Sequence, residues 1–294
     1  MYDIEALYEA KSAAHAVELL REHPEAHVIA GGSDVLIEIR DGKLAGCSLV
    51  SIQKLDELRG VSLDEGGGAI RIGALTSMSH ITADPVIQKY LRVLGEAVDT
   101  VGGPQLRNIA TIGGNVCNGV TSADSASTLM AWDAVMEYLG PSGTRRVPIR
   151  EHYVSAGKTS LAHDEILLAL VIPRESFENC FGYYIKYAMR EALDIATLGC
   201  SANVRLSKDK TQIERLRLAY GVAGPVPTRS PSAEAAAAGK PISTAAVAEA
   251  AKAALDDVNP RTSWRASREF RLHLTEELAK RTITESIKRA GGLL

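Results

Sequence analysis

Short apolar blocks, separated by glycine, proline and polar positions, divide the first part of the chain into small elements. Ser12 can cap a helix whose alanine, valine and leucine side chains lie on one side and which ends at Pro24. The following blocks predict a strand over 27–30, a short helix over 35–39 and a second strand over 49–52. This spacing is typical of a small α/β unit.

The pattern then changes to alternating strands and short helices. Residues 61–73 alternate around three glycines, which predicts a hairpin. Asp84 followed by Pro85 is a typical helix start, and the helix is expected to continue to about residue 98. The other predicted elements of this part are helices over 76–81 and 125–132 and strands over 134–138, 146–149 and 165–172.

Beyond Pro173 the pattern becomes one of strands followed by helices, which is typical of an α+β unit. The predicted elements are antiparallel strands over 183–188, 199–206 and 213–222 and helices over 243–255 and 265–290. We therefore expect a first domain over residues 1–175 and a smaller C-terminal α+β domain over residues 179–294.

The composition indicates an ordinary globular protein. Of the 294 residues, 46% are hydrophobic and 23% are charged, and the formal net charge is -3. The chain therefore lacks the basic footprint that binds nucleic acid or an anionic membrane. No apolar run is long enough to span a bilayer, and the first twenty residues do not form a signal region. We expect a cytoplasmic protein with neither a nucleic-acid nor a membrane partner.

The cysteines and histidines form no recognisable metal or disulfide pattern. Cys47, Cys117, Cys180 and Cys200 lie far apart without a Cys-x-x-Cys pair, which favours reduced thiols. The seven histidines are scattered and form no His-x-x-x-His pair. We therefore expect no metal site in this chain.

Two glycine-rich segments of the first domain are the strongest candidates for ligand binding. Residues 29–34 place two glycines between a strand and a helix, an arrangement that points free N–H groups at an anion. Residues 104–124 combine paired glycines with asparagines and hydroxyls. Neither segment matches the phosphate loop or the dinucleotide-binding signature. Either one alone fits a simple surface loop, but two in one domain fit an elongated ligand with a central diphosphate.

No residue stands out as catalytic. Asp124 could act as a general base, but a lone aspartate near a helix start is more often a cap. Cys117 has no basic partner close in sequence, which favours a packed thiol. Arg190, Glu191 and Asp194 fit either a charged site or an ion-pair network. A chain without a nucleophile or a metal suits an enzyme whose chemistry resides in a bound cofactor.

Ala-Gly-Gly-Ser-Asp at 30–34 and Thr-Ile-Gly-Gly-Asn at 111–115 resemble the two FAD-binding motifs of the molybdenum hydroxylase flavoproteins. That family includes the FAD subunits of xanthine dehydrogenase and carbon monoxide dehydrogenase. The likeness continues through 164–168, 187–196 and 263–274, and it is nearest to the separate FAD subunit of bacterial xanthine dehydrogenases. It implies an α+β fold in which a two-subdomain FAD-binding domain (PCMH-like) precedes a smaller C-terminal domain with an antiparallel sheet and helices.

The resemblance also implies a set of FAD-binding positions in this sequence. Those around the diphosphate are His27, Val28, Ile29, Ala30, Gly31, Gly32, Ser33 and Asp34. Those on the opposite wall are Thr111, Ile112, Gly113, Gly114, Asn115, Asn118, Thr121 and Asp124. Leu167 would pack near the isoalloxazine or the adenine, and Lys186 would approach the flavin ring. Without the resemblance, Lys186 fits a charge at a strand edge.

The function implied is electron transfer within a molybdenum hydroxylase. Partner chains would carry the molybdopterin cofactor and [2Fe-2S] clusters, and the FAD held here would pass electrons to NAD or another acceptor. The partner's substrate could be xanthine, carbon monoxide, an aldehyde or an N-heterocycle. The alternatives from other classes are a non-catalytic scaffold or maturation chain and a self-sufficient flavin oxidase.

Overall fold

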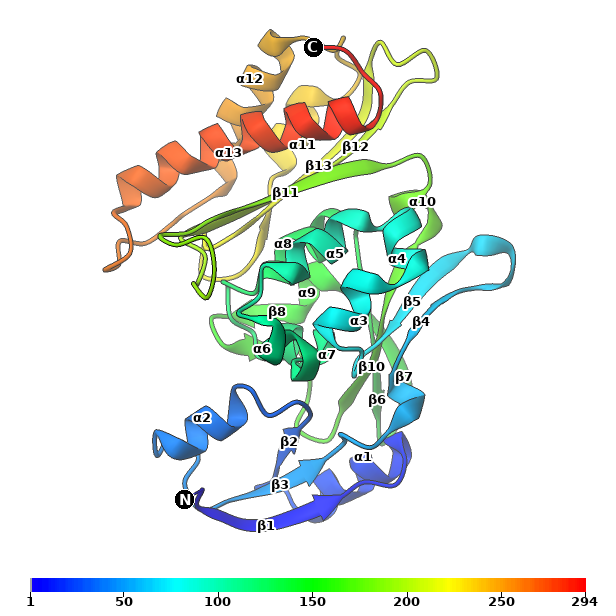
Figure 1. Ribbon diagram of the computed structural model, residues 1–294, viewed down its shortest axis with the longest axis vertical. Helices are drawn as coiled ribbons and strands as arrows, with labels where there is room; N and C mark the ends of the chain where they lie inside the picture. Colours follow the sequence, from blue (N-terminus) through cyan, green and yellow to red (C-terminus); the bar gives the residue numbers. More distant parts are fainter. Residues whose placement is uncertain (1) are drawn as a thin grey trace.

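The computed structural model describes residues 2–294 and contains three larger sheets stacked along the long axis of the molecule, besides one two-stranded ribbon (Figure 1). The first sheet has three parallel strands in the order β1-β3-β2, and α1 packs between it and the second sheet. The elements of this first subdomain are β1 (Ile4–Glu9), α1 (Ala13–Glu22), β2 (His27–Ile29), α2 (Val35–Arg40) and β3 (Cys47–Ser51).

The second sheet has five antiparallel strands in the order β4-β5-β10-β6-β7 and carries most of the short helices. Its strands are β4 (Val61–Leu63), β5 (Ala69–Gly73), β6 (Val135–Gly140), β7 (Gly143–Pro148) and β10 (Ile166–Pro173), with a separate ribbon of β8 (Tyr153–Ser155) and β9 (Lys158–Thr159). The helices are α3 (Met78–Ala83), α4 (Pro85–Tyr90), α5 (Arg92–Asp99), α6 (Pro104–Ile109), α7 (Ile112–Cys117), α8 (Asp124–Ala131), α9 (Ile149–His152) and α10 (Arg174–Phe177). Single 3₁₀ turns lie at Asp56–Leu58 and Glu65–Gly67.

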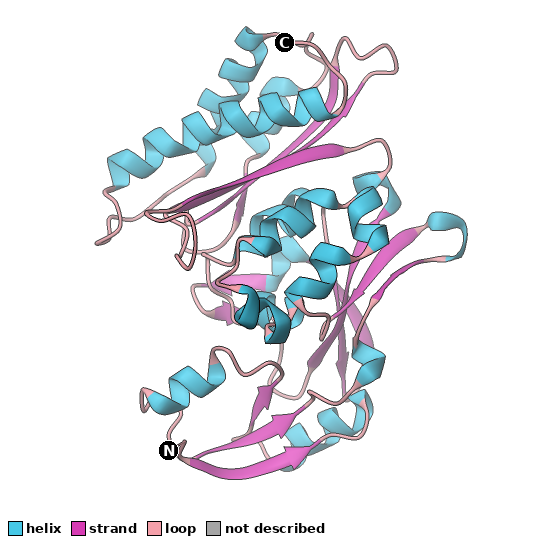
Figure 2. Ribbon diagram, viewed as in Figure 1, coloured by secondary structure: helices cyan, strands magenta, loops and turns pink. Residues whose placement is uncertain are grey.

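The third sheet is antiparallel, in the order β11-β12-β13-β14, and both of its faces are covered. Its strands are β11 (Phe181–Tyr187), β12 (Leu198–Leu206), β13 (Ile213–Gly221) and β14 (Thr228–Arg229). One face packs against α11 (Pro231–Ala237) and α13 (Arg268–Arg289). α12 (Thr244–Ala253) and a 3₁₀ turn (Ala254–Asp257) pack against these two helices. The other face packs against α5 and α8 of the central part, so the sheet lies between two layers of helices (Figure 2).

Small residues allow this second face to approach the central helices. A Cβ added to Gly182 on β11 would lie 2.0 Å from the Trp132 ring, so the strand can pass the indole only as glycine. Asn203 of β12 donates to the carbonyl oxygens of Ala131 and Ser176 at 3.3 and 2.9 Å. The central part and the C-terminal part therefore share one closely packed, hydrogen-bonded boundary.

Most of the predicted elements are present, including the helix capped by Ser12, the hairpin over 61–73 and the three long C-terminal strands. The helix predicted over 85–98 is interrupted at the buried Leu91, where φ is -133° and ψ is 32°, and continues as α5. The glycine-rich 104–124 segment is not a loop, because it contains α6 and α7. The strand β1 was not predicted, although its exposed and half-buried positions alternate. Within residues 2–294, no helix is both long and apolar enough to cross a membrane.

A buried polar pair supports α7 from behind. His152 is fully buried, and its Nε2 lies 3.1 Å from the Val116 carbonyl oxygen of α7. Its Nδ1 is hydrogen-bonded to the Tyr138 hydroxyl on β6. In the neutral tautomer that satisfies both contacts, Nε2–H donates to the carbonyl and Nδ1 accepts from the tyrosine. Burial lowers the pKa of His152, so the folded chain keeps this imidazole neutral.

The buried imidazole makes the free energy of unfolding depend on pH. As the pH falls from 7 to 5, the unfolded chain binds a proton at this histidine near its ordinary pKa while the folded chain resists it. We therefore expect stability to be full above about pH 6.5 and to fall by up to about 1.4 kcal/mol per pH unit below it. Urea unfolding at several pH values would measure this slope.

His152→Gln should flatten that part of the pH dependence, because glutamine can donate and accept but does not titrate. The matched control is His163→Gln at an exposed position. Equal slopes for His152→Gln and the wild-type chain would show that His152 does not carry the effect.

Candidate functional site

The two glycine-rich segments meet at a backbone contact between subdomains. A Cβ added to Gly31 would lie 2.1 Å from the carbonyl oxygen of Ile109, at the end of α6. Any larger residue would therefore push the β2–α2 loop away from the α6–α7 junction. Figure 1 shows β2 and α2 on the side of the first subdomain that faces α6 and α7. The structure thus places Gly31 of the first segment against residues 109–110, immediately before the 111–115 positions of the second.

The β2–α2 loop supplies hydrogen-bond donors. Within residues 2–294, the backbone N–H groups of Gly31, Gly32 and Ser33 have no acceptor. All three residues are half-buried, and Gly32 adopts a φ of 73°, which glycine reaches without strain. Asp34 follows at the start of α2 without a side-chain capping bond. Successive unpaired N–H groups in a turn of this kind form a concavity that suits an anion.

The opposite wall, α7, contributes shape rather than free donors. The N–H groups of Ile112 and Gly113 donate to the Thr76 and Ala74 carbonyl oxygens at 3.0 and 2.8 Å. The Thr111 hydroxyl accepts from the Gly114 N–H at 3.1 Å and so caps the helix. Gly114 itself is exposed, and a Cβ there would meet only the Thr111 hydroxyl, at 3.0 Å. This side of the site is therefore a bare surface that a flat ligand can approach closely.

Two further wall residues are tied into the protein by their side chains. Asn115 accepts a hydrogen bond from the Ser125 hydroxyl at 2.6 Å. The Thr121 hydroxyl donates to the Gly224 carbonyl oxygen at 3.1 Å and lies 3.2 Å from the Val222 N–H, which links the wall to the C-terminal part. Asn118 is half-buried at the end of α7. The wall is thus fixed from two directions.

Asp124 is not the helix cap that its position suggested. Ala123 occupies the N-cap position of α8, and Asp124 is buried one residue later. Its carboxylate accepts from the Tyr184 hydroxyl and from Lys186 Nζ, each at 2.8 Å. Burial raises the pKa of this carboxyl, while Lys186 and Tyr184 oppose the rise. The predicted cap is absent because Tyr184 and Lys186 of β11 hydrogen-bond the Asp124 carboxylate instead.

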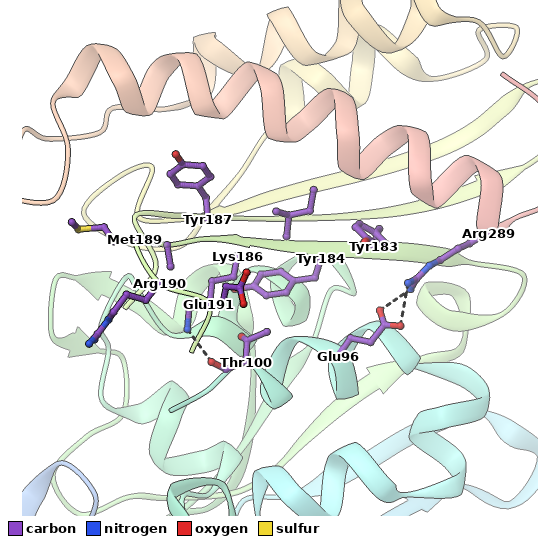
Figure 3. A pocket seen from close by; sticks show the side chains of 12 residues that line it. Glu96, Thr100, Tyr183, Tyr184, Lys186, Tyr187, Met189, Arg190, Glu191 and Arg289 are labelled. Carbon is purple, nitrogen blue, oxygen red and sulfur yellow. Dashed lines mark hydrogen bonds and ion pairs between the residues drawn. The ribbon is translucent and has the colours of Figure 1, made fainter. Parts of the chain in front are cut away.

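Lys186 is held at the boundary between the two halves of the chain. Its side chain is 11% exposed, and Nζ also donates to the Thr100 carbonyl oxygen at 3.0 Å (Figure 3). It lines a cavity of about 670 Å³ between β11, the loop that follows it and α5. Glu96 and Arg289, which pair at 2.7 Å, lie at the far end of the same cavity. The residues of the two glycine segments are not among those that line this cavity.

The remaining predicted positions have different surroundings. His27 is exposed, and Val28, Ile29 and Ala30 are half-buried along β2 and its end. Leu167 is 4% exposed within the core of the central sheet, so most of its surface already contacts protein. Its proposed contact with a ligand remains a prediction.

Other candidate groups have structural roles. Burial raises the pKa of the Cys117 thiol to about 12, as expected of a packed thiol. Asp194 accepts from the backbone N–H groups of Met189, Arg190 and Ile195, so it shapes its own loop. Within residues 2–294, no three side chains of the metal-binding types gather as ligands.

Sequence reasoning missed Tyr184 and Thr100 as partners at the site. Tyr184 lies two positions before Lys186 on the same face of β11, and its hydroxyl reaches Asp124 across the domain boundary. Thr100 contributes only its carbonyl oxygen. Neither contact has a local sequence signal, because the residues involved are 60 and 86 positions apart.

Comparisons with known proteins identify the family of the chain. Residues 2–175 match the family described as FAD binding domain in molybdopterin dehydrogenase, and residues 183–286 match the CO dehydrogenase flavoprotein C-terminal domain. The xanthine dehydrogenase FAD-binding subunit of Escherichia coli O157:H7 is 43% identical over 294 residues, which is 100% of both chains. The carbon monoxide dehydrogenase medium chain of Hydrogenophaga pseudoflava is 28% identical over 280 residues, covering 95% of this chain and 96% of that one.

A solved structure gives the same result for the fold. The carbon monoxide dehydrogenase from Hydrogenophaga pseudoflava that lacks the Mo-pyranopterin moiety contains a chain that superposes with a TM-score of 0.93 at 28% identity. The match covers 98% of this chain and 99% of that one. The predicted resemblance and the α+β fold are therefore confirmed. The chain belongs to the family of FAD-binding subunits of the molybdenum hydroxylases, a family of oxidoreductases.

Proposed function

We propose that this chain is the electron-transferring FAD subunit of a xanthine dehydrogenase-like complex. In this proposal FAD lies between the β2–α2 loop and α7, over residues 27–34 and 111–115, and extends toward Asp124 and Lys186. The division into domains 1–175 and 179–294 belongs to the same proposal, because it assigns the anion-binding loop to the first domain and the lysine to the second.

The observation that carries the proposal is the set of three unpaired N–H groups at Gly31, Gly32 and Ser33. Oriented backbone donors without a basic side chain suit a diphosphate, whose charge they can share among several oxygens. The bare surface at Gly114 lies on the other side of the backbone contact and leaves room for close approach. The residues present therefore fit the cofactor that the family description names.

Lys186 would tune the bound group rather than react. When bound, FAD would supply the redox chemistry, taking electrons from partner [2Fe-2S] clusters and delivering them to NAD or another acceptor. A cation near the ring favours negative charge there and so raises the reduction potential. Asp124 and the Thr100 carbonyl hold the ammonium group in place. Asp124 also offsets part of its charge.

The partners and substrate follow from the relatives. A chain of this length without clustered cysteines depends on partners for the molybdopterin and the [2Fe-2S] clusters. The full-length likeness to a xanthine dehydrogenase FAD-binding subunit supports xanthine, a purine, as the substrate oxidised at the partner's molybdenum. We propose that the complex is cytoplasmic. Carbon monoxide, an aldehyde or an N-heterocycle are the alternatives within the family, and a scaffold or maturation chain is the alternative outside it.

Gly114→Val should lower FAD binding at least tenfold, or about 1.4 kcal/mol, because the new side chain projects from an exposed, otherwise open surface. The chain should stay folded, since only one hydroxyl lies within reach of the added Cβ. Flavin content after incubation with FAD is the measurement. Gly68→Val in the exposed β4–β5 turn is the matched control, because nothing lies within 4 Å of its Cβ. Full flavin content in Gly114→Val would contradict the assigned site.

Lys186→Met should lower the midpoint potential of bound flavin by roughly 30 mV, which for two electrons is about 1.4 kcal/mol. The Asp124→Asn/Lys186→Met double variant removes both charges and should lie nearer the wild-type potential. Spectroelectrochemical titration of the three proteins tests this expectation. An unchanged potential in a Lys186→Met protein that retains flavin would remove the proposed tuning role.

Anaerobic addition of NADH to the FAD-loaded chain tests the acceptor. If NAD is the physiological acceptor, NADH should bleach the visible flavin absorption by the reverse reaction. Flavin that is bound but untouched by NADH would keep the FAD assignment and exclude NAD. A chain that takes up no FAD would favour the scaffold alternative.

A further inference from the structure

Four arginines gather where α13 begins, and the first turn of that helix also carries the acidic residue Glu269. Arg261, Arg265, Arg268 and Arg271 lie in the loop before α13 and in its first turn. Within residues 2–294, none of them has a carboxylate oxygen within 4.0 Å. Arg229, by contrast, is paired with both Asp133 and Glu234. The α13 cluster is therefore a patch of net positive charge, which Glu269 offsets only in part, on a chain whose formal net charge is -3.

Arg271 is the buried member of this arginine cluster and holds the loop before α13 in place. Its side chain is 2% exposed, and it donates to the Arg261 carbonyl oxygen at 3.0 Å and to the Ser263 hydroxyl at 2.8 Å. Its Nε has no partner among the described residues. Burial and the neighbouring Arg261 and Arg265 lower its pKa. A buried guanidinium left without a carboxylate is costly unless an anion outside this chain offsets it.

Trp264 stands at the tip of the loop that Arg271 holds. It is 76% exposed, the highest exposure of any aromatic side chain described, and the Arg265 guanidinium lies 4.1 Å from its ring centroid. Exposing a large aromatic ring to water is unfavourable. Tryptophan and arginine together are the residue types most enriched at binding hot spots.

Further apolar side chains lie beside this loop. Phe270 is 41% exposed, and its ring meets Tyr187 of β11 edge-to-face at 5.9 Å. The β11–β12 loop that follows adds Met189, which is 64% exposed. Both loops lie at the same end of the C-terminal part in Figure 1. We name this surface the tryptophan edge; it consists of Tyr187, Met189, Arg261, Trp264, Arg265, Arg268 and Phe270.

We propose that the tryptophan edge docks an acidic segment of a partner subunit, with an apolar side chain seated on Trp264 and carboxylates facing Arg265 and Arg268. The inference rests on the proposed function, which places this chain in a multi-subunit complex. Charge complementarity identifies the occupant, because unpaired arginines beside exposed apolar rings suit carboxylates within a protein surface. A nucleic acid is disfavoured by the chain's negative net charge.

The test uses the complex purified through a tag on this chain, with its partner chains identified by bound molybdenum and iron. The Arg265→Glu/Arg268→Glu variant and Trp264→Ser are compared with Arg21→Glu/Arg150→Glu, which reverses two exposed arginines elsewhere. We expect the first two to weaken association with the isolated partners at least 30-fold and the control to change it less than threefold. Wild-type affinity should also fall with added salt, and the arginine variant should lose that dependence.

The remaining outcomes separate this inference from the proposed function. Flavin content should be unchanged in every variant. Wild-type affinity in both edge variants would overturn the docking site while leaving the FAD subunit assignment intact. Loss of self-association alone, measured by light scattering, would replace the partner with a second copy of this chain and also overturn it. A wild-type chain that copurifies with no molybdenum- and iron-containing partner would instead contradict the proposed function.

Discussion

The contact between Gly31 and the carbonyl of Ile109 sets the geometry of the site. It brings a loop with unpaired N–H groups from one subdomain against a bare helical wall from another, with no side chain between them. A second close approach, Gly113 against the Ala74 carbonyl, seats that wall on the central sheet. Both contacts are made at glycines against a backbone carbonyl. The site therefore depends on the positions of backbone segments of this chain rather than on a reactive side chain. This arrangement suits a protein whose chemistry is brought in by a cofactor.

Local sequence patterns predicted elements well where one strong signal dominates. The cap at Ser12 and the long apolar run of β10 are examples, and both are present. The prediction failed where tertiary contacts override local preference. Paired glycines at 113 and 114 argue against a helix, yet α7 forms because the Ala74 and Thr76 carbonyls bond its first turn. Leu91, whose side chain is buried in the core, interrupts a predicted helix, and no local sequence signal marks that break.

The candidate site was predicted in part, through the resemblance of its two glycine motifs, and the structure brings those motifs together. The roles of the two walls could not be read from the sequence, since both contain paired glycines. The hydrogen bonds distinguish them: among the described residues, the N–H groups of 31–33 have no acceptor, whereas those of 112–114 donate to groups of this chain. Asp124 shows the same limit, because its cation comes from a residue 62 positions away.

The C-terminal sheet is packed on both faces, and this has an evolutionary consequence. Residue 182 must be glycine to pass Trp132, and Asn203 must donate hydrogen bonds to the carbonyl oxygens of Ala131 and Ser176. Recombination that exchanged the second half of the gene with that of a distant relative would have to preserve all of these pairs at once. Along this boundary, the two halves of the chain can therefore diverge only in step with each other.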